Sequence, residues 1–290
     1  MAEKQVVGRE NRTILAERLA EHAPPGLDSA SVAWARTFAE HGRRARRIRR
    51  VLRALPGDPR CKICHAPFTG AAGRMLRLTG FRASRKSPEL CHVCVEEGPA
   101  GGFEAEIGIL FGDVRGFTSF AESHTPSETA QTLQRFYDVA SRTIIKHEGI
   151  VDKLVGDQVM ALFWPVVMDA PACPAMVDAA HDLLREVGHG SAEGAWLPLG
   201  IGLDYGTAYV GNVGGEGLRD FTALGDVVNT ASRLQGEAGA GEVVMGDRVY
   251  GAVAQRFPEV ERVEVALKGK SLPTTAYRLA IAQLATRRTR

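Results

Sequence analysis

The spacing of apolar and polar residues from Phe103 to about Ala282 alternates between strand and helix patterns. The stretch EIGILFGDV is an almost continuous apolar run, which predicts a buried strand. The next helix is predicted to open at TPSE, where Thr125 caps it, Pro126 takes the first helical position and Glu128 closes a capping box. Apolar residues then recur at helical spacing, and Gly149 is predicted to end the helix.

The remaining predicted elements follow at short intervals. Two apolar strands, IVDKLV and QVMALF, are separated only by Gly156 and Asp157, which predicts a tight hairpin. A second helix is predicted from Ala172 to Val187, and a third from Asp226 to Glu237. We interpret WLPLGIGLDYG and TAYVGNVG as a strand pair, and EVVMG, VEVALKG and TAYRLA as three further strands.

This order of elements predicts an α+β fold with a ferredoxin-like βαββαβ core and extra C-terminal strands. The helices are expected on one face of a mostly antiparallel sheet. Composition divides the chain further. The predicted divisions are a helical, basic N-terminal region at 1–55, a small four-cysteine segment at 56–100, the α+β domain at 103–282 and a disordered basic tail at 283–290.

Composition and charge exclude several classes of protein. The chain has 290 residues and a formal net charge of +2, so no strongly acidic or basic partner is implied for the whole chain. The N-terminus is charged and lacks the apolar core of a signal peptide. The longest apolar stretch, VMALFWPVVM, is too short to cross a bilayer and is broken by Pro165. We therefore expect a cytoplasmic protein without a membrane span.

Two aspartates occupy chemically suggestive positions. Asp113 ends the first predicted strand, and Asp157 lies at the tip of the predicted hairpin. Two carboxylates at one sheet edge could share divalent cations such as Mg²⁺, which prefers a few oxygen ligands together with substrate phosphates. The segment VRGFTS after Asp113 offers backbone N–H groups to phosphate oxygens. The plain alternative is that each Asp beside a Gly only forms a turn.

Five segments in order resolve this choice. FGDVRGFTSFAE, EGIVDKLVGDQVMALF, GIGLDYGTAYVGNVG, FTALGDVVNTASRLQ and LKGKSLPTTAYRL extend over about 180 residues. Together they resemble the signature of class III nucleotidyl cyclases, the family of adenylyl and guanylyl cyclases. One such segment would be weak evidence, whereas five in family order make chance similarity very improbable. The resemblance implies that 103–282 is the catalytic domain.

The resemblance also implies residue roles. Asp113 and Asp157, with Val114 beside the first, match the site that holds two Mg²⁺ or Mn²⁺ ions. Asn229 matches the residue that orients the ribose, and Arg233 the one that stabilises the pentavalent transition state. On the third predicted helix these two residues share a face that lies away from its apolar positions. The remaining nucleotide-binding residues implied are Lys153, Thr222, Lys268, Phe117 and Thr118, with Lys270 close enough to compete with Lys268.

The base-reading residues indicate a preference for ATP. A lysine such as Lys153 donates to N1 of adenine, whereas guanine presents a donor there and would favour a carboxylate. Thr222 stands where many family members carry an aspartate. It can accept from the adenine amino group but can also donate to guanine, so a guanylate cyclase is the alternative. Threonine at this position is similar to the branch that includes bicarbonate-responsive cyclases, so bicarbonate or another small molecule is expected as an activator.

Family members bind the nucleotide between two cyclase domains, one supplying the metals and the other the Asn and Arg. This chain carries both halves of the set once, which implies a head-to-tail homodimer. The predicted activity is conversion of ATP to cyclic AMP and pyrophosphate in intracellular signalling. The rival hypothesis is a non-catalytic module that senses nucleotide or a partner. The presence of both aspartates, Asn229 and Arg233 favours the enzyme.

Four of the five cysteines form two CxxC pairs, Cys61 with Cys64 and Cys91 with Cys94. Two such knuckles can present four thiolates tetrahedrally, which favours structural Zn²⁺. The long gap between the pairs leaves an iron–sulfur cluster or unligated thiols as alternatives. CKICH also fits c-type haem attachment through His65, which would require export. The cysteine segment, with the arginine-rich helix before it, admits a DNA-binding hypothesis, but no base-reading motif is recognisable, so a nucleic-acid partner is not expected.

Overall fold

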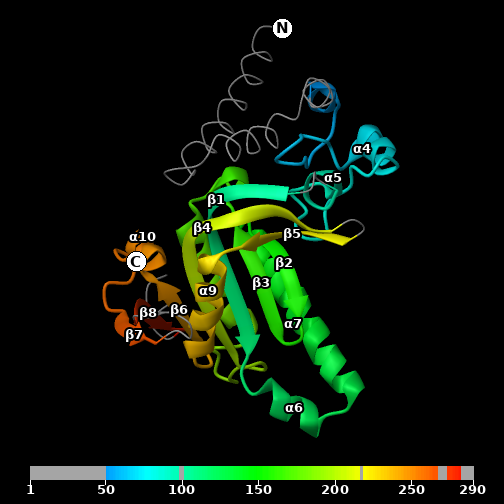
Figure 1. Cartoon of the computed structure of the whole chain (residues 1–290). Coiled ribbons are helices and arrows are strands. Elements are labelled where there is room, and N and C mark those ends of the chain that lie inside the picture. Colours follow the sequence, from blue (N-terminus) through cyan, green and yellow to red (C-terminus); the bar gives the residue numbers. More distant parts are fainter. Residues whose placement is uncertain (1–49, 98–100, 216–217, 267–272, 282–290) are drawn as a thin grey trace. The chain divides into compact units, whose positions relative to one another are not determined.

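The computed structural model describes residues 50–97, 101–215, 218–266 and 273–281 (Figure 1). Residues 1–49 of the predicted helical region 1–55, and the predicted tail at 283–290, lie outside the described residues. The chain divides into two compact units. The first comprises Met1–Glu106, Pro165–Asp169 and Thr207–Leu224, and the second comprises Ile107–Trp164, Ala170–Gly206 and Gly225–Arg290. No described helix is long and apolar enough to cross a membrane.

The second unit is built on a mixed sheet whose strands follow the order β2-β3-β1-β4-β6-β8-β7 (Figure 1). The β4–β6 pair is parallel, whereas β1–β3, β2–β3, β6–β8 and β7–β8 are antiparallel, so the expected mostly antiparallel sheet is confirmed. The strands are β1 (Gly101–Val114), β2 (Ile150–Val155), β3 (Gln158–Phe163), β4 (Leu199–Gly215), β6 (Glu242–Gly246), β7 (Glu261–Val265) and β8 (Thr274–Ala280).

Among its described residues, the second unit contains five helices. They are α6 (Phe117–Ser123), α7 (Pro126–Lys146), α8 (Ala172–Glu186), α9 (Asp226–Glu237) and α10 (Asp247–Val253). The predictions for α7, α8 and α9 are confirmed to within one or two residues. The short helices α6 and α10 were not predicted, because seven residues give too few turns for an apolar stripe to stand out.

The start of α7 follows from its sequence. The Thr125 side chain accepts from the Glu128 N–H, the Glu128 carboxylate accepts from the Thr125 N–H, and Pro126 takes the first helical position. The predicted capping box is therefore confirmed. The predicted end was wrong in detail: the left-handed residue is Glu148, at φ 62°, and not Gly149. Gly149 is needed for close approach instead, since a Cβ there would lie 2.7 Å from a side-chain carbon of Ile144.

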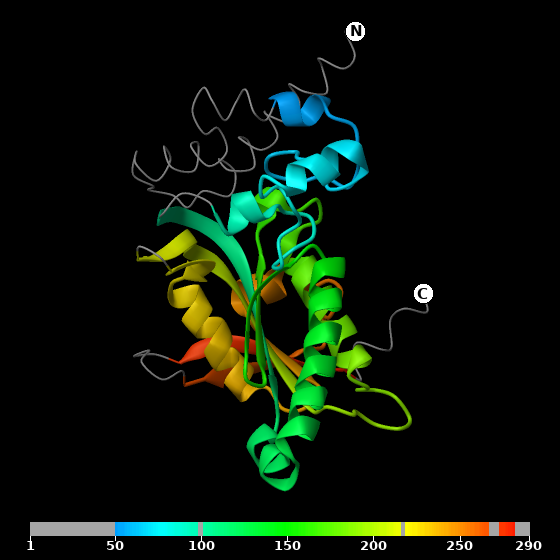
Figure 2. The same cartoon turned by 90° about the vertical axis from the view of Figure 1, so that its right-hand side faces the viewer.

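The helices cover both faces of the sheet, so the expectation that they lie on one face was wrong. Figure 2 shows α7 and α8 on one side of the strands and α9 on the other. A Cβ on Gly108 of β1 would meet the sulfur of Met176 in α8 at 3.0 Å. A Cβ on Gly202 of β4 would lie 2.2 Å from the Gln235 nitrogen in α9. Glycine at 202 therefore lets the α9 backbone rest directly on the sheet.

The two strands predicted from WLPLGIGLDYG and TAYVGNVG are in fact one strand, β4. Gly206, the last residue of the first predicted strand, continues directly into the second, and a Cβ there would lie 3.5 Å from the Val227 side chain. The second half of β4, from Tyr209 to Gly215, pairs with β5 (Leu218–Leu224), a strand that was not predicted from the sequence. In β5, Phe221, Thr222 and Ala223 are all buried, so the alternation typical of a half-exposed strand is missing.

The first unit combines the β4–β5 hairpin with the cysteine segment. Besides β5 it contains α4 (Gly70–Arg77), α5 (His92–Val95) and the 3-10 turn η1 (Pro165–Val167). Its buried core includes Ala66, Leu90 and Val95. A small apolar core that is lined by four cysteines is typical of a segment that needs a metal to fold firmly.

We predict that Gly202→Ala destabilises the second unit by about 1–3 kcal/mol, because the new methyl group would force α9 away from β4. Urea unfolding followed by circular dichroism measures the effect. The matched control is Gly236→Ala within α9, where a Cβ meets nothing within 4 Å. That control should be neutral or stabilising by up to about 1 kcal/mol, because alanine favours a helix over glycine. A Gly202→Ala protein as stable as the wild type would contradict this packing.

Candidate functional site

The pairing of β1 with β3 places Asp113 beside Asp157. In the antiparallel register Asp113 lies opposite Gln158, the residue that follows Asp157. The Val114 N–H donates to the Asp157 carbonyl at 3.2 Å, which joins the end of β1 to the tip of the β2–β3 hairpin. The two aspartates are therefore close together, as predicted, because of the register between β1 and β3. Val114 is buried, and its carbonyl oxygen is the only further ligand atom it could offer.

The two carboxylates repel each other. Burial and then the charge of Asp157 raise the pKa of Asp113, while Arg115 and Gln235 lower it less strongly. The Arg115 guanidinium lies 3.8 Å from the Asp113 carboxylate, beyond the length of a good ion-pair hydrogen bond. A site that gathers carboxylates with too little positive charge suits a divalent cation, which would remove the repulsion. The residues present therefore fit Mg²⁺ or Mn²⁺.

Tyr137 is a residue of this site that the sequence did not single out. It lies on α7, where it takes one of the positions at which apolar residues recur with helical spacing. Its hydroxyl donates to the Gly156 carbonyl, in the two-residue turn that carries Asp157. Burial and then the charge of Asp157 raise the pKa of Tyr137, consistent with a phenol close to that carboxylate. Tyr137 therefore positions the hairpin tip.

Arg115 is a second residue that was missed, although it lies within the DVRGFTS segment. Its N–H donates to the Pro198 carbonyl at 2.7 Å, and its guanidinium donates to the Gln235 carbonyl at 2.7 Å near the end of α9. The Arg115 guanidinium thus links the end of β1 to the helix that carries Asn229 and Arg233. No sequence signal distinguished this arginine from an exposed one.

The turn after Asp113 leads into α6. Gly116 adopts the left-handed conformation at φ 71°, which glycine allows without strain, and Phe117 begins the helix. Phe117 is half-buried and stacks on Phe120 with ring centroids 5.9 Å apart, whereas Thr118 is exposed. The predicted phosphate contacts would use the first backbone N–H groups of α6.

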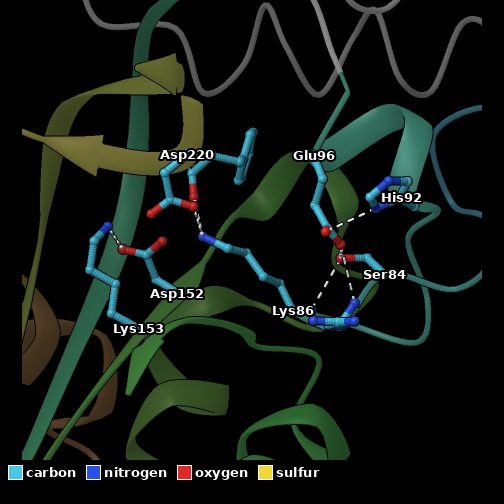
Figure 3. Close-up of polar contacts among 9 residues, drawn as sticks. Ser84, Lys86, His92, Glu96, Asp152, Lys153 and Asp220 are labelled. Carbon is cyan, nitrogen blue, oxygen red and sulfur yellow. Dashed lines mark hydrogen bonds and ion pairs between the residues drawn. The ribbon is translucent and has the colours of Figure 1, made fainter. Parts of the chain in front are cut away.

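Lys153 lies on β2 beside a fully buried acid. Its ammonium is 3.1 Å from the Asp152 carboxylate, and the Lys153 side chain is 40% exposed while that of Asp152 is 0% exposed (Figure 3). The β2–β3 register shifts between Val151 and Lys153, a bulge-like irregularity. Irregularities of this kind redirect side chains next to functional sites. The Lys153 ammonium is therefore held by Asp152, while part of the Lys153 side chain stays accessible.

On α9 the predicted division of faces is confirmed. Val227 and Leu234 are buried, Asn229 is exposed, and Arg233 is half-exposed. With the described residues Arg233 forms no ion pair.

Two further residues, Thr222 and Lys268, were predicted to bind the nucleotide. Thr222 belongs to the first unit, where it lies on β5, pairs with Gly211 of β4 and is 6% exposed. Lys268, with the competing Lys270, lies outside the described residues.

The four cysteines of the two CxxC pairs come together. The sulfur atoms of Cys61, Cys64, Cys91 and Cys94 all lie within 4.8 Å of one another. None of them forms a disulfide. One ion at a metal–sulfur distance of about 2.3 Å holds tetrahedral thiolates about 3.8 Å apart, so the compact group suits a single ion.

The backbone around the thiols has the form of metal-binding knuckles. The Cys91 N–H donates to the Cys61 sulfur at 3.2 Å, and the Cys94 N–H donates to the Cys91 sulfur at 3.3 Å. Burial raises the pKa of Cys61, but hydrogen bonds from the other three cysteines outweigh burial and lower it overall. The imidazole of His65 contacts the Arg53 guanidinium at 2.7 Å and is not one of the grouped ligands.

The family comparison matches most of the second unit. The model for the adenylate and guanylate cyclase catalytic domain matches residues 103–280. Adenylate cyclase 1 of Rhizobium meliloti (strain 1021) is 32% identical over 158 residues, 51% of this chain and 24% of that protein. The adenylate cyclase of Anabaena cylindrica is 35% identical over 132 residues, 44% of this chain and 26% of that protein. The chain thus spans about a quarter of the length of these relatives.

Solved structures agree with the fold. The guanylyl cyclase Cya2 superposes with a TM-score of 0.55 at 27% identity, covering 61% of this chain and 93% of that one. The adenylyl cyclase CyaB from P. aeruginosa gives a TM-score of 0.52 at 26% identity, covering 60% of this chain and 93% of that one. The α+β fold predicted from the order of elements is confirmed.

We predict that Tyr137→Phe weakens Mn²⁺ binding about tenfold, because the loss of its hydrogen bond to Gly156 releases the turn that holds Asp157. Electron paramagnetic resonance of added Mn²⁺ measures the affinity. The matched control is Tyr250→Phe, which also removes a hydroxyl that donates to a backbone carbonyl, that of Phe257 at 3.4 Å. Equal Mn²⁺ affinity in the two variants would show that Tyr137 does not position the site.

Proposed function

Because the chain belongs to the family of adenylate and guanylate cyclase catalytic domains, we propose that it converts ATP to 3′,5′-cyclic AMP and pyrophosphate in intracellular signal transduction. The observation that carries the proposal is the placement of Asp113 and Asp157 side by side, with the Val114 N–H bonded to the Asp157 carbonyl. Residues 103–282 form the catalytic domain in this proposal, and 56–100 a metal-binding segment.

The residues that would hold the two divalent cations are Asp113, Asp157 and the Val114 carbonyl. Two Mg²⁺ or Mn²⁺ ions bound there would lower the pKa of the ribose 3′-hydroxyl and neutralise charge on the departing pyrophosphate. The partial burial of Asp113 favours binding of a cation over hydration of the bare carboxylate.

The remaining roles belong to side chains that position and clamp the nucleotide. Asn229 would hydrogen-bond the ribose, and Arg233 would donate to the oxygens of the pentavalent phosphorus. A guanidinium suits this task because it stays charged and presents a fork of donors. The N–H groups of Phe117 and Thr118 would bind phosphate oxygens, and Lys268 would neutralise the terminal phosphates. Catalysis then rests on position and charge, with no covalent intermediate on the protein.

Lys153 and Thr222 would select the base. Lys153 keeps 40% of its side chain exposed and can donate to N1 of adenine. Thr222 would accept from the adenine amino group. Its hydroxyl can also donate, which leaves guanylate cyclase activity as the second candidate. In the branch that Thr222 resembles, bicarbonate stimulates turnover, and we extend that property to this chain.

The chain would act as a head-to-tail homodimer with ATP as its substrate. Asn229 and Arg233 lie on the outward face of α9, and Arg233 has no ion pair among the described residues, so a second chain could use them. Asp113 and Asp157 would be contributed by the other copy. This arrangement gives two equivalent composite sites.

The four cysteines would bind one structural Zn²⁺. Their sulfurs lie within 4.8 Å of one another, and two of them accept backbone N–H bonds. A cluster with several iron atoms would spread the thiolates further apart than one ion does. The proposed Zn²⁺ would stabilise the fold of the segment, and its thiolate ligands would leave no open position for a substrate.

We predict that the purified protein with Mg²⁺ or Mn²⁺ forms cyclic AMP faster than cyclic GMP, as read by product chromatography. Lys153→Glu combined with Thr222→Cys should lower the ATP-to-GTP ratio of kcat/KM at least about tenfold, because the donor for N1 of adenine becomes an acceptor. Added bicarbonate at fixed pH should raise the rate. A protein that binds ATP without turnover would support the non-catalytic module instead.

We predict that Asp157→Ala and Arg233→Ala each lower kcat about 10²-fold or more, because each removes one half of the composite site. Co-refolding the two variants should restore part of the activity, since a mixed dimer keeps one complete site. Mass spectrometry must confirm the mixed dimers. Mixed dimers without recovered activity would contradict shared sites.

We predict one zinc ion per chain by elemental analysis and no visible absorption from iron. Cys64→Ala together with Cys91→Ala should abolish zinc binding, because two ligands remain of four. Cys173→Ala is the control, since Cys173 lies outside the group. A folded wild-type protein that holds no zinc would overturn the assignment.

A further inference from the structure

Lys86 connects the cysteine segment to β5. Its ammonium lies 2.7 Å from the Asp220 carboxylate and donates to the Phe221 carbonyl at 2.5 Å, across 135 positions of sequence (Figure 3). The Lys86 side chain is only 14% exposed. A largely buried ammonium that donates to a carboxylate and a carbonyl forms charge-assisted bonds, which are among the stronger hydrogen bonds in proteins.

The loop that carries Lys86, residues 84–90, is anchored to both cysteine knuckles. Its base is closed by a bond from the Ser84 N–H to the Leu90 carbonyl at 2.8 Å, and Cys91 follows at once. From the first knuckle, the Lys62 N–H donates to the Glu89 carbonyl at 2.9 Å. The Lys62 ammonium also pairs with the Glu89 carboxylate at 3.1 Å. Movement of either knuckle must therefore move this loop.

A polar network runs from the second knuckle to Lys86 itself (Figure 3). His92, between Cys91 and Cys94, pairs with Glu96 at 2.9 Å. Glu96 accepts from the Ser84 hydroxyl at 2.8 Å, and the Lys86 N–H donates to the same hydroxyl at 3.1 Å. This chain of contacts ties the Lys86 backbone to the second knuckle.

At the other end of the contact lies the strand that carries the base-reading threonine. Thr222 directly follows Phe221, and among the described strands β5 pairs with β4 alone. Thr222 pairs with Gly211 across the β4–β5 ladder. The Lys86 ammonium thus holds the β5 backbone at Phe221, the residue directly before Thr222.

The geometry points to Lys86 as a positioning residue that couples metal occupancy of the four cysteines to base selection by Thr222. Resting on the proposed cyclase function, the inference adds a route of regulation to it. Four thiolates on one ion cross-link the two knuckles and fix residues 84–90, which hold β5 through Lys86. Loss of the ion removes this cross-link and leaves the hydrogen bonds and the Lys62–Glu89 ion pair to hold the knuckles together, so the Lys86 anchor loosens.

The experiment compares the wild type, Lys86→Met and Arg85→Met, each with bound Zn²⁺ and after its removal by a chelator in reducing buffer. Arg85 is the matched control because it is an exposed cation on the same loop, whose backbone N–H, not its guanidinium, contacts Glu96. Two quantities are measured: amide hydrogen exchange of residues 218–224, and the ATP-to-GTP ratio of kcat/KM.

For the wild type and Arg85→Met, removal of Zn²⁺ should speed exchange in 218–224 and lower the ATP-to-GTP ratio about three- to tenfold. Lys86→Met should bind a full equivalent of Zn²⁺ and yet already show the faster exchange and the lower ratio. Removal of Zn²⁺ from that variant should change neither quantity by more than about twofold. Lys86→Arg should restore part of the coupling.

If zinc-loaded Lys86→Met keeps wild-type exchange and selectivity, or responds to zinc removal as fully as the wild type, the inference is overturned. It is equally overturned if the wild type takes up no added Zn²⁺. Should Lys86→Met fail to fold, Asp220→Asn removes the partner carboxylate from the β5 side and must give the same result. A wild type that forms no cyclic nucleotide defeats the proposed function, while the exchange measurement still decides whether Lys86 couples the cysteines to β5.

Discussion

The structure depends on the antiparallel pairing of β1 with β3, which places two carboxylates side by side. The register that sets Asp113 opposite Gln158 also brings Asp157 to the end of β1. Burial and the charge of Asp157 then raise the pKa of Asp113, so keeping both carboxylates ionised is energetically unfavourable without a cation. A divalent cation would relieve that cost. The neighbouring contacts, from Tyr137 to the hairpin turn and from Arg115 to α9, hold the two acids and the helix in position.

Close packing likewise fixes the position of α9. Gly202 lets the helix backbone lie against the sheet, because a side chain at position 202 would collide with the backbone of Gln235 and Ala231. Asn229 then lies on the exposed face of the helix. The hydrogen bond from the Arg115 guanidinium to the Gln235 carbonyl fixes the C-terminal end of α9. The proposed chemistry uses these groups only by position and charge, so small displacements of the helix matter more than changes in the groups themselves.

The sequence predicts those parts of the fold whose conformation is determined by residues close together in the chain. The capping box at Thr125 and Glu128 and the two-residue turn at Gly156 are complete within a few residues, so their positions could be predicted. Positions that depend on the surrounding fold were harder to predict. Gly206 lies inside one continuous strand, and Gly149 follows the left-handed Glu148 at a point where a Cβ would lie 2.7 Å from the Ile144 side chain. Strand β5 was missed because three successive residues, Phe221, Thr222 and Ala223, are buried, so the strand lacks the alternation of a half-exposed one.

The candidate site shows the same division. Asp113, Asp157, Asn229 and Arg233 could be predicted because they lie in segments that resemble a known family, whereas Tyr137, Arg115 and Lys86 act through partners far away in the chain. The central claim is that the two aspartates form one cation site. Anomalous X-ray scattering from crystals grown with Mn²⁺ and a non-reacting ATP analogue tests it most directly. The account predicts manganese peaks between the carboxylates of Asp113 and Asp157, and ordered manganese elsewhere with none at these aspartates would contradict it.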